Sequence, residues 1–289
     1  MDDMTITVSG TVADRAELTY KVVGERRIEL TFLAPIEKKF DRAPVYLVIA
    51  GGGWHEERRA DMLGMAGRSV DALRRAGFAV VSPDYRVTGE VSMRAVISDC
   101  MDAARYLVHF AEPLGIDRDR FVVSGHSAGG HLCLMMANAP HGEFAEDSPF
   151  DAVADDFKVI GAAPMRPPTV LYDAATGAWP FNVEYARVFP NEPATHAHRH
   201  YLSPIDYITP CSVPTLLTYG THDNLVYPEN SLYYYDRCRA VGAPCEIEAS
   251  HFGGHCFEEK IKGMTPIPGL AGMQDGITAF ALRVLESSR

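Results

Sequence analysis

The chain has 289 residues, 47% of them hydrophobic and 22% charged, which is enough to bury the core of one large α/β domain. Its formal net charge of -11 argues against a nucleic-acid partner, because an acidic surface repels phosphate backbones. No apolar run reaches the roughly eighteen residues that a membrane span needs, so no membrane partner is expected.

The cysteines and the N-terminus indicate a compartment. The six cysteines show no C-x-x-C spacing, and the opening MDDMTITVSG has neither a basic start nor an apolar stretch. We therefore expect no signal peptide and free thiols in a reducing cytoplasm.

Strand and helix signals alternate along most of the chain. Two alternating runs, 16–23 and 27–33, predict an antiparallel hairpin. Further strands are expected over 45–50, 78–82, 121–124, 157–162, 214–219 and 245–249, and helices over 61–76, 94–111, 128–139, 229–241 and 273–286. This alternation predicts an α/β fold with a mostly parallel central sheet flanked by helices.

Residues 141–210 are the irregular part of the sequence. They are rich in acidic residues, then in prolines and aromatics, and are long for a connection inside a compact domain. We expect a single domain over 1–289, with a small cap or lid within about 141–210.

A candidate nucleophile lies between a predicted strand and a predicted helix. Gly125-His126-Ser127-Ala128-Gly129 fits G-x-S-x-G, in which the serine occupies a strained turn that needs small neighbours. The alternative, a glycine-rich turn that merely contains serine, lacks a reason for this strand-turn-helix context. Ser127 is therefore the predicted nucleophile.

A nucleophilic serine needs a base, and the base needs a group that orients it. Asp223 and His255 each follow a predicted strand, in the order serine, acid, histidine, and the carboxyl ends of strands carry the chemistry of open α/β sheets. Weaker candidates for these two roles are Asp206, Asp173, His251 and His222.

Glycines directly after the 45–50 strand predict an oxyanion hole. The N–H groups of Gly51, Gly52 and Gly53 can turn toward a tetrahedral oxyanion, joined by that of Ala128 after the nucleophile. No G-K-[ST] follows, so a phosphate loop is excluded, and a plain tight turn is the alternative.

Together these motifs resemble the hormone-sensitive-lipase-like esterases. The carrying segments are Gly51-Gly52-Gly53-Trp54, GHSAGGH at 125–131, Asp223 and Gly254-His255, with Asp84-Tyr85-Arg86, Gly115-Ile116-Asp117 and Ser203-Pro204-Ile205 in support. Within them the chain is most similar to the bacterial esterase and feruloyl-esterase-like branch that borders kynurenine formamidase. The resemblance covers about residues 25 to 289. It implies an α/β-hydrolase fold and a serine esterase.

The chain departs from that pattern at Ala50, where the family normally has a histidine that steadies the oxyanion loop. Three consecutive glycines have high conformational freedom. We therefore expect another side chain, His55 or Arg86, to hydrogen-bond the loop.

Residues for substrate binding are predicted near the site. Trp54, His126 and Trp179 are the candidates, although aromatic residues in a cap can equally serve cap packing. His196, His198 and His200 would share a face of an extended chain, but no carboxylate lies at a suitable spacing. We read them as a solvated loop and expect neither a metal nor a cofactor.

The combined reading is a serine hydrolase that cleaves short-chain or aryl carboxylic esters through an acyl-enzyme. An arylformamidase acting on N-formylkynurenine needs the same machinery and stays open, as does a homo-oligomer. A non-catalytic ligand receptor is disfavoured because all three triad positions are filled. A peptidase stays possible, although we expect no extra domain of the kind that usually restricts substrate entry.

Overall fold

The computed structural model describes residues 14–56, 59–172 and 185–288. Within these ranges eight strands form one sheet, in the spatial order β1 (Arg15–Val23), β2 (Arg26–Leu33), β4 (Ala79–Pro83), β3 (Ala43–Ile49), β5 (Ile116–His126), β6 (Val159–Met165), β7 (Thr215–Gly220) and β8 (Cys245–Ser250). The β1–β2 and β2–β4 pairs are antiparallel, and each pairing from β4 to β8 is parallel. The predicted mostly parallel sheet is confirmed.

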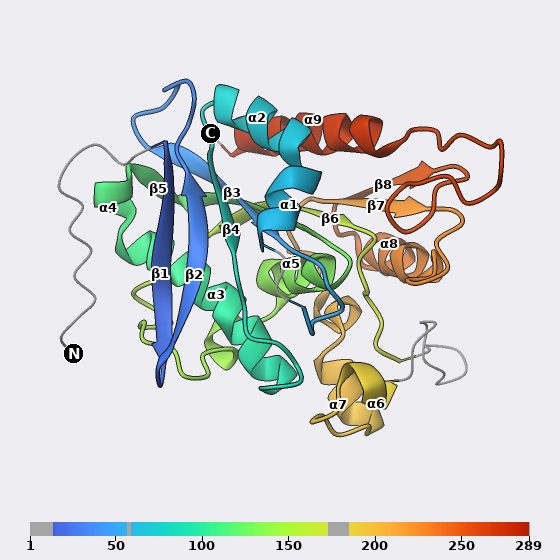
Figure 1. The fold of residues 1–289 in the computed structure, drawn as a ribbon, viewed down its shortest axis with the longest axis horizontal. Helices are drawn as coiled ribbons and strands as arrows, with labels where there is room; N and C mark the ends of the chain where they lie inside the picture. Colours follow the sequence, from blue (N-terminus) through green and yellow to red (C-terminus); the bar gives the residue numbers. More distant parts are fainter. Residues whose placement is uncertain (1–13, 57–58, 173–184, 289) are drawn as a thin grey trace.

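Helices cover both faces of this sheet (Figure 1). One face carries α1 (Arg59–Met65), α2 (Gly67–Arg75) and α9 (Leu270–Ser287). The other carries α3 (Met93–His109), the short α4 (Ala111–Leu114), α5 (Ala128–Asn138) and α8 (Glu229–Val241). The single helix predicted over 61–76 is two helices that meet at Ala66, between Gly64 and Gly67, which have low helix propensity.

The central strand β3 shows why these strands read as continuous apolar runs. Val45, Leu47 and Ile49 pack into the core beneath α3 and α5. Tyr46 and Val48 pack into the core beneath α1, α2 and α9. Because side chains alternate across a strand, a strand covered on both faces needs an apolar residue at each position.

The stretch 141–210 contributes both to the sheet and to elements outside it. β6 belongs to the central sheet, whereas η1 (His141–Glu143), α6 (Tyr185–Val188), α7 (His196–Tyr201) and η2 (Pro204–Tyr207) lie outside it. Figure 1 places α6 and α7 together, on the α5 side of the sheet. A cap within one single domain stays a prediction. No helix in the described ranges has both the length and the apolar character to cross a membrane.

A cluster of buried charges joins β1 to α3. Lys21 Nζ lies 2.8 Å from Asp99 Oδ1 and 2.7 Å from Asp102 Oδ2. Asp99 also accepts from Arg86 at 2.8 Å, and Asp102 from Arg105 at 2.7 Å. Each cation has a carboxylate partner, which is the condition under which charges can be buried. The cluster also ties the segment after β4, through Arg86, to α3.

Asp102→Ala should lower the free energy of unfolding by about 3 to 5 kcal/mol, because it removes a buried carboxylate from Lys21 and Arg105. Urea denaturation followed by circular dichroism measures this loss. The matched control is Glu246→Ala, which breaks an exposed pair with Arg283 at 2.7 Å and should cost less than about 1 kcal/mol. Equal losses in the two variants would contradict a stabilising role for the buried cluster.

Candidate active site

Ser127 occupies a strained turn between β5 and α5. Its φ of 54° lies in the left-handed region that side chains rarely adopt. A Cβ on Gly125 would lie 2.3 Å from the Gly129 carbonyl oxygen, and one on Gly129 would lie 2.2 Å from that of Ile49. The two glycines therefore let the turn close and let α5 begin against the end of β3.

Asp223 and His255 come together from the ends of β7 and β8. The His255 ring places Nδ1 2.7 Å from Asp223 Oδ2. Asp223 Oδ1 accepts the backbone N–H groups of Leu225 at 2.9 Å and Val226 at 3.1 Å. Asp223 is 4% exposed, and both of its carboxylate oxygens accept hydrogen bonds. It can therefore hold the imidazole of His255 in one orientation and leave Nε2 free to take a proton.

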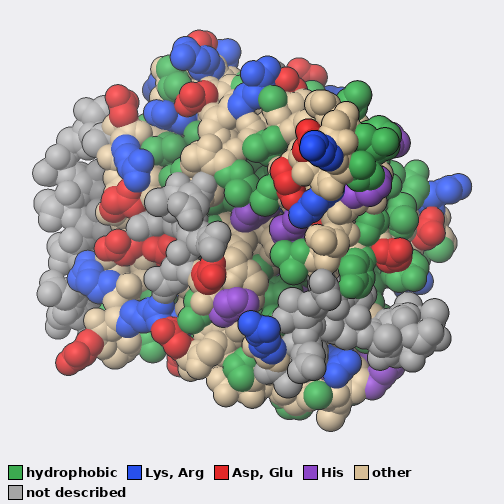
Figure 2. Space-filling view, turned by 45° about the vertical axis from the view of Figure 1, so that its right-hand side comes forward, with side chains coloured by type: hydrophobic (Ala, Val, Ile, Leu, Met, Phe, Trp, Pro, Cys, Tyr) green, Lys and Arg blue, Asp and Glu red, His purple; other side chains and the backbone are tan. Residues whose placement is uncertain are grey.

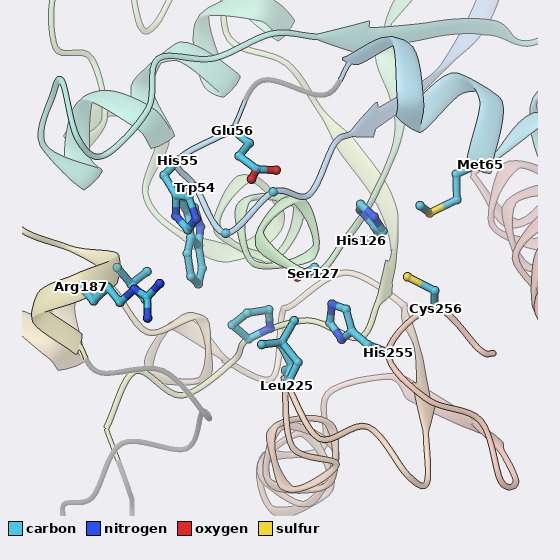
Figure 3. A pocket seen from close by; sticks show the side chains of 15 residues that line it. Trp54, His55, Glu56, Met65, His126, Ser127, Arg187, Leu225, His255 and Cys256 are labelled. Atoms are coloured by element: carbon cyan, nitrogen blue, oxygen red, sulfur yellow. The ribbon is translucent and has the colours of Figure 1, made fainter. Parts of the chain in front are cut away.

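Ser127 and His255 line one pocket, of about 720 Å³ (Figure 3). Figure 2 shows histidine side chains gathered around a hollow, in a view turned so that the β7 and β8 side of Figure 1 comes forward. In the described part of the chain, the His255 ring bonds Asp223 and makes no hydrogen bond to Ser127. A bond between nucleophile and base commonly tightens only when substrate binds.

The oxyanion loop differs from expectation at Gly51. Its N–H donates to His126 Nδ1 at 2.9 Å and is therefore not free to bind an oxyanion. This contact removes Gly51 from the residues predicted to form the oxyanion hole. A Cβ at Gly51 would meet the His126 ring at 2.4 Å, so only glycine fits there. Gly52 and Gly53, at φ 123° and 61°, line the pocket. Ala128 opens α5, where a helix leaves N–H groups without intrahelical acceptors.

The loop is braced, but by neither side chain that the sequence suggested. His126 accepts from Gly51, and Tyr85 Oη donates to the Ala50 carbonyl at 2.9 Å. Arg86 is instead held by the carboxylates of Asp99 and Asp147. His55 is exposed and bonds the loop only through its backbone N–H, to Gly52. The expectation for His55 and Arg86 is therefore wrong, because carboxylates hold the Arg86 side chain and the loop bonds His126 and Tyr85 instead.

Trp54 and His131 form a second support that the sequence did not reveal. Trp54 lines the pocket at φ 63°, and its Nε1 donates to His131 Nδ1 at 3.3 Å. His131 Nε2 in turn lies 2.8 Å from the Leu202 carbonyl. Burial lowers the pKa of His131 to about 4, so its ring is neutral and can both accept and donate. The sequence feature that could have pointed to this support is His131, the second histidine of GHSAGGH.

The competing acids and histidines lie elsewhere. Asp206 accepts from Tyr172 Oη at 2.9 Å and pairs with His200 at 2.8 Å. His222 contacts Thr221, and His251 forms an isolated bridge with Ile267. Asp173 falls outside the described residues.

The three alternating histidines lie on a helix, α7, and not on the loop that was expected. Helical spacing puts His196 and His200 on one face, 3.3 Å apart, whereas His198 pairs with Glu192. Among the described residues, no group of three or more His, Cys, Asp or Glu side chains is arranged to hold a metal ion.

The pocket walls come from segments far apart in sequence. Two predicted substrate-binding residues, Trp54 and His126, line the pocket, whereas Trp179 falls outside the described residues. Wall residues that the sequence did not indicate are Glu56, Met65, Pro168, Arg187, Val188, Leu225, Val226 and Cys256. No local motif marks them, because they come from α1, α6 and the separate segments that follow β3, β6, β7 and β8.

Comparison with known proteins places this site in a family. The model of the BD-FAE family matches residues 31–237, more than half of the chain. The chain belongs to the BD-FAE family. The match to BD-FAE includes Ser127 and Asp223 and ends before His255.

Relatives of this BD-FAE chain include two proteins of Mycobacterium tuberculosis. A probable carboxylic ester hydrolase, LipM, is 27% identical over 75% of the chain and 50% of LipM. The esterase LipC is 29% identical over 69% of the chain and 49% of LipC. The chain thus spans about half the length of these relatives.

Solved structures share the fold of this BD-FAE chain. Esterase Est2 of Thermogutta terrifontis superposes with a TM-score of 0.76 at 22% identity, covering 94% of this chain and 92% of Est2. This likeness confirms the predicted α/β-hydrolase fold.

Acid should destabilise the protein through His131. Its pKa is about 4 in the folded state and 6.5 ordinarily, so the unfolded chain takes up the proton first as pH falls. Stability is lost between pH 6.5 and about 4, by roughly 3 kcal/mol from this residue. Urea denaturation across this range should show a shallower pH dependence in His131→Asn. An unchanged dependence would contradict a buried neutral His131.

Proposed function

We propose that this BD-FAE chain is a serine hydrolase that cleaves carboxylic esters, short-chain or aryl, through an acyl-enzyme intermediate. The observation that carries the proposal is the Asp223–His255 hydrogen bond at 2.7 Å, beside a strained serine that lines the same pocket. The names of the relatives, carboxylic ester hydrolase and esterase, support the same reaction. A small-molecule substrate and a reducing, cytoplasmic compartment belong to this proposal.

In the proposed mechanism, Ser127 Oγ attacks the ester carbonyl carbon while His255 Nε2 takes the hydroxyl proton. Asp223 accepts from Nδ1–H, which fixes the tautomer and stabilises the imidazolium. The N–H groups of Gly52, Gly53 and Ala128 stabilise the oxyanion. His255 then gives its proton to the leaving alkoxide oxygen, and the alcohol departs.

Deacylation repeats the same steps with water. His255 takes a proton from the water, whose oxygen attacks the acyl carbon. The oxyanion collapses, the bond to Ser127 Oγ breaks, and Oγ recovers the proton. The products are the carboxylic acid, the alcohol and the free enzyme, so no further reactant is needed.

Ser127→Ala should abolish turnover and leave the fold intact, because it removes the nucleophile and adds no atom. We would measure p-nitrophenyl acetate, p-nitrophenyl octanoate and N-formylkynurenine side by side, which also separates ester from formamide preference. A fluorophosphonate should label the wild type and not the variant, with circular dichroism as the folding control. Label on any other residue of the wild type would refute Ser127 as nucleophile.

Asp223→Asn should reduce kcat by about four orders of magnitude, as the equivalent change does in serine proteases. The matched control is Asp206→Asn, since Asp206 is exposed and pairs with His200 instead. That variant should retain turnover of p-nitrophenyl acetate. A crippled Asp206 variant beside a nearly silent Asp223 variant would show that the acid is misassigned.

A further inference from the structure

Arg166 is held where arginine is costly on two counts. It directly follows β6 at φ 49°, in the left-handed region that non-glycine residues rarely adopt. Its side chain is only 1% exposed. The preceding residue, Met165, accepts the N–H of Ser127 at 2.9 Å, so Arg166 is tied to the nucleophile turn. Costs of this kind persist where surrounding structure imposes them, and they concentrate at functional sites.

The guanidinium of Arg166 has no anionic partner among the described residues. Nε and Nη1 are buried without a hydrogen-bond acceptor. Nη2 reaches only the sulfur of Met65, at 3.9 Å, and the group lies 4.6 Å from the centre of the Phe257 ring. Buried polar groups in proteins are almost always paired, so two donor nitrogens without a partner on one cation call for an acceptor.

Acidic groups within electrostatic range of Arg166 are already engaged. Asp223 accepts from His255, Leu225 and Val226, and Glu258 binds Lys260 and the Cys256 N–H. Burial lowers the pKa of Arg166, yet a guanidinium stays protonated in proteins. The side chain is therefore a permanent cation whose fork of donors has no carboxylate to bind.

The unpaired cation lies directly behind one wall of the catalytic pocket. Met65, whose sulfur contacts the guanidinium, lines that pocket, and so does Cys256, the neighbour of Phe257. Figure 3 shows the Met65 and Cys256 side chains on the same side of the pocket as His126 and His255. The flexible thioether of Met65 thus contacts the guanidinium and also lines the pocket that Ser127 lines.

We propose that Arg166 binds a carboxylate on the ester substrate, which reaches the guanidinium when the Met65 side chain turns aside. The planar fork of arginine matches two carboxylate oxygens and would satisfy the orphaned donors. This inference rests on the proposed hydrolase function. It narrows the substrate class to esters that carry a free carboxylate on one arm.

A second cation at the pocket supplies the matched control. Arg187 lines the pocket from α6 and is exposed, and Figure 3 places it across the pocket from Met65 and Cys256. An exposed arginine attracts anions weakly in water, whereas a buried one acts at low dielectric. The two arginines can therefore be told apart by single substitutions.

The kinetic test compares mono-p-nitrophenyl adipate with its methyl ester, which differ only in the carboxylate. The wild type should favour the acid in kcat/KM, and Arg166→Met should reduce this preference by tenfold or more, as expected for a charge-assisted bidentate bond. Arg187→Met should keep the preference. No preference in the wild type, or its loss in Arg187→Met and not in Arg166→Met, overturns the proposal.

A binding test needs no turnover and separates the two proposals. Adipate should raise the melting temperature of the wild type and of Ser127→Ala, but not that of Arg166→Met, and Met65→Ala should enhance the shift by opening access. Arg166→Met should fold at least as well as the wild type, because it removes an unpaired buried charge. An adipate shift without esterase turnover refutes the hydrolase function alone. Turnover with equal shifts in wild type and Arg166→Met refutes the carboxylate site.

Discussion

The contact between the end of β3 and the first turn of α5 is the constraint on which the whole site depends. Gly129 has no Cβ, so α5 can begin against the carbonyl of Ile49, and Gly51 has none, so the loop after β3 can pass the His126 ring. The Gly51–His126 hydrogen bond then ties the loop after β3 to the end of β5. Backbone packed against backbone leaves little freedom, which is how a loop of three glycines acquires a defined shape beside Ser127.

The buried cations of the interior fall into two groups, which differ in whether a carboxylate lies beside them. Beneath α3, each of the buried cations Lys21, Arg86 and Arg105 has a carboxylate within about 3 Å, so that region is a structural anchor. Behind the catalytic pocket, Arg166 is buried with two donors unpaired. Arg105 also leaves Nε without an acceptor but keeps Asp102 as its partner, whereas Arg166 has no carboxylate partner among the described residues. The proposed carboxylate site rests on this contrast.

Much of the fold could be predicted because it depends on local patterns. The helix over 229–241 and the strands on both faces of the core follow from hydrophobic periodicity and from glycine and proline at element ends. Prediction was wrong in two segments, one broken by glycines of low helix propensity and one stabilised by contacts with residues outside it. The 61–76 helix breaks at Ala66, and the segment with His196, His198 and His200 is helical, with Glu192 and Asp206 binding two of its imidazoles.

The sequence by itself determined the candidates for chemistry: Ser127 in its glycine frame, the order of Asp223 and His255 after successive strands, and the glycines after β3. These are local features, since a strained turn or a strand end is written in adjacent residues. Only the tertiary structure decided how the oxyanion loop is braced, by His126 and Tyr85, and which side chains wall the pocket. Those contacts join residues from separate elements at one edge of the sheet, and no spacing along the chain encodes which loops will meet there.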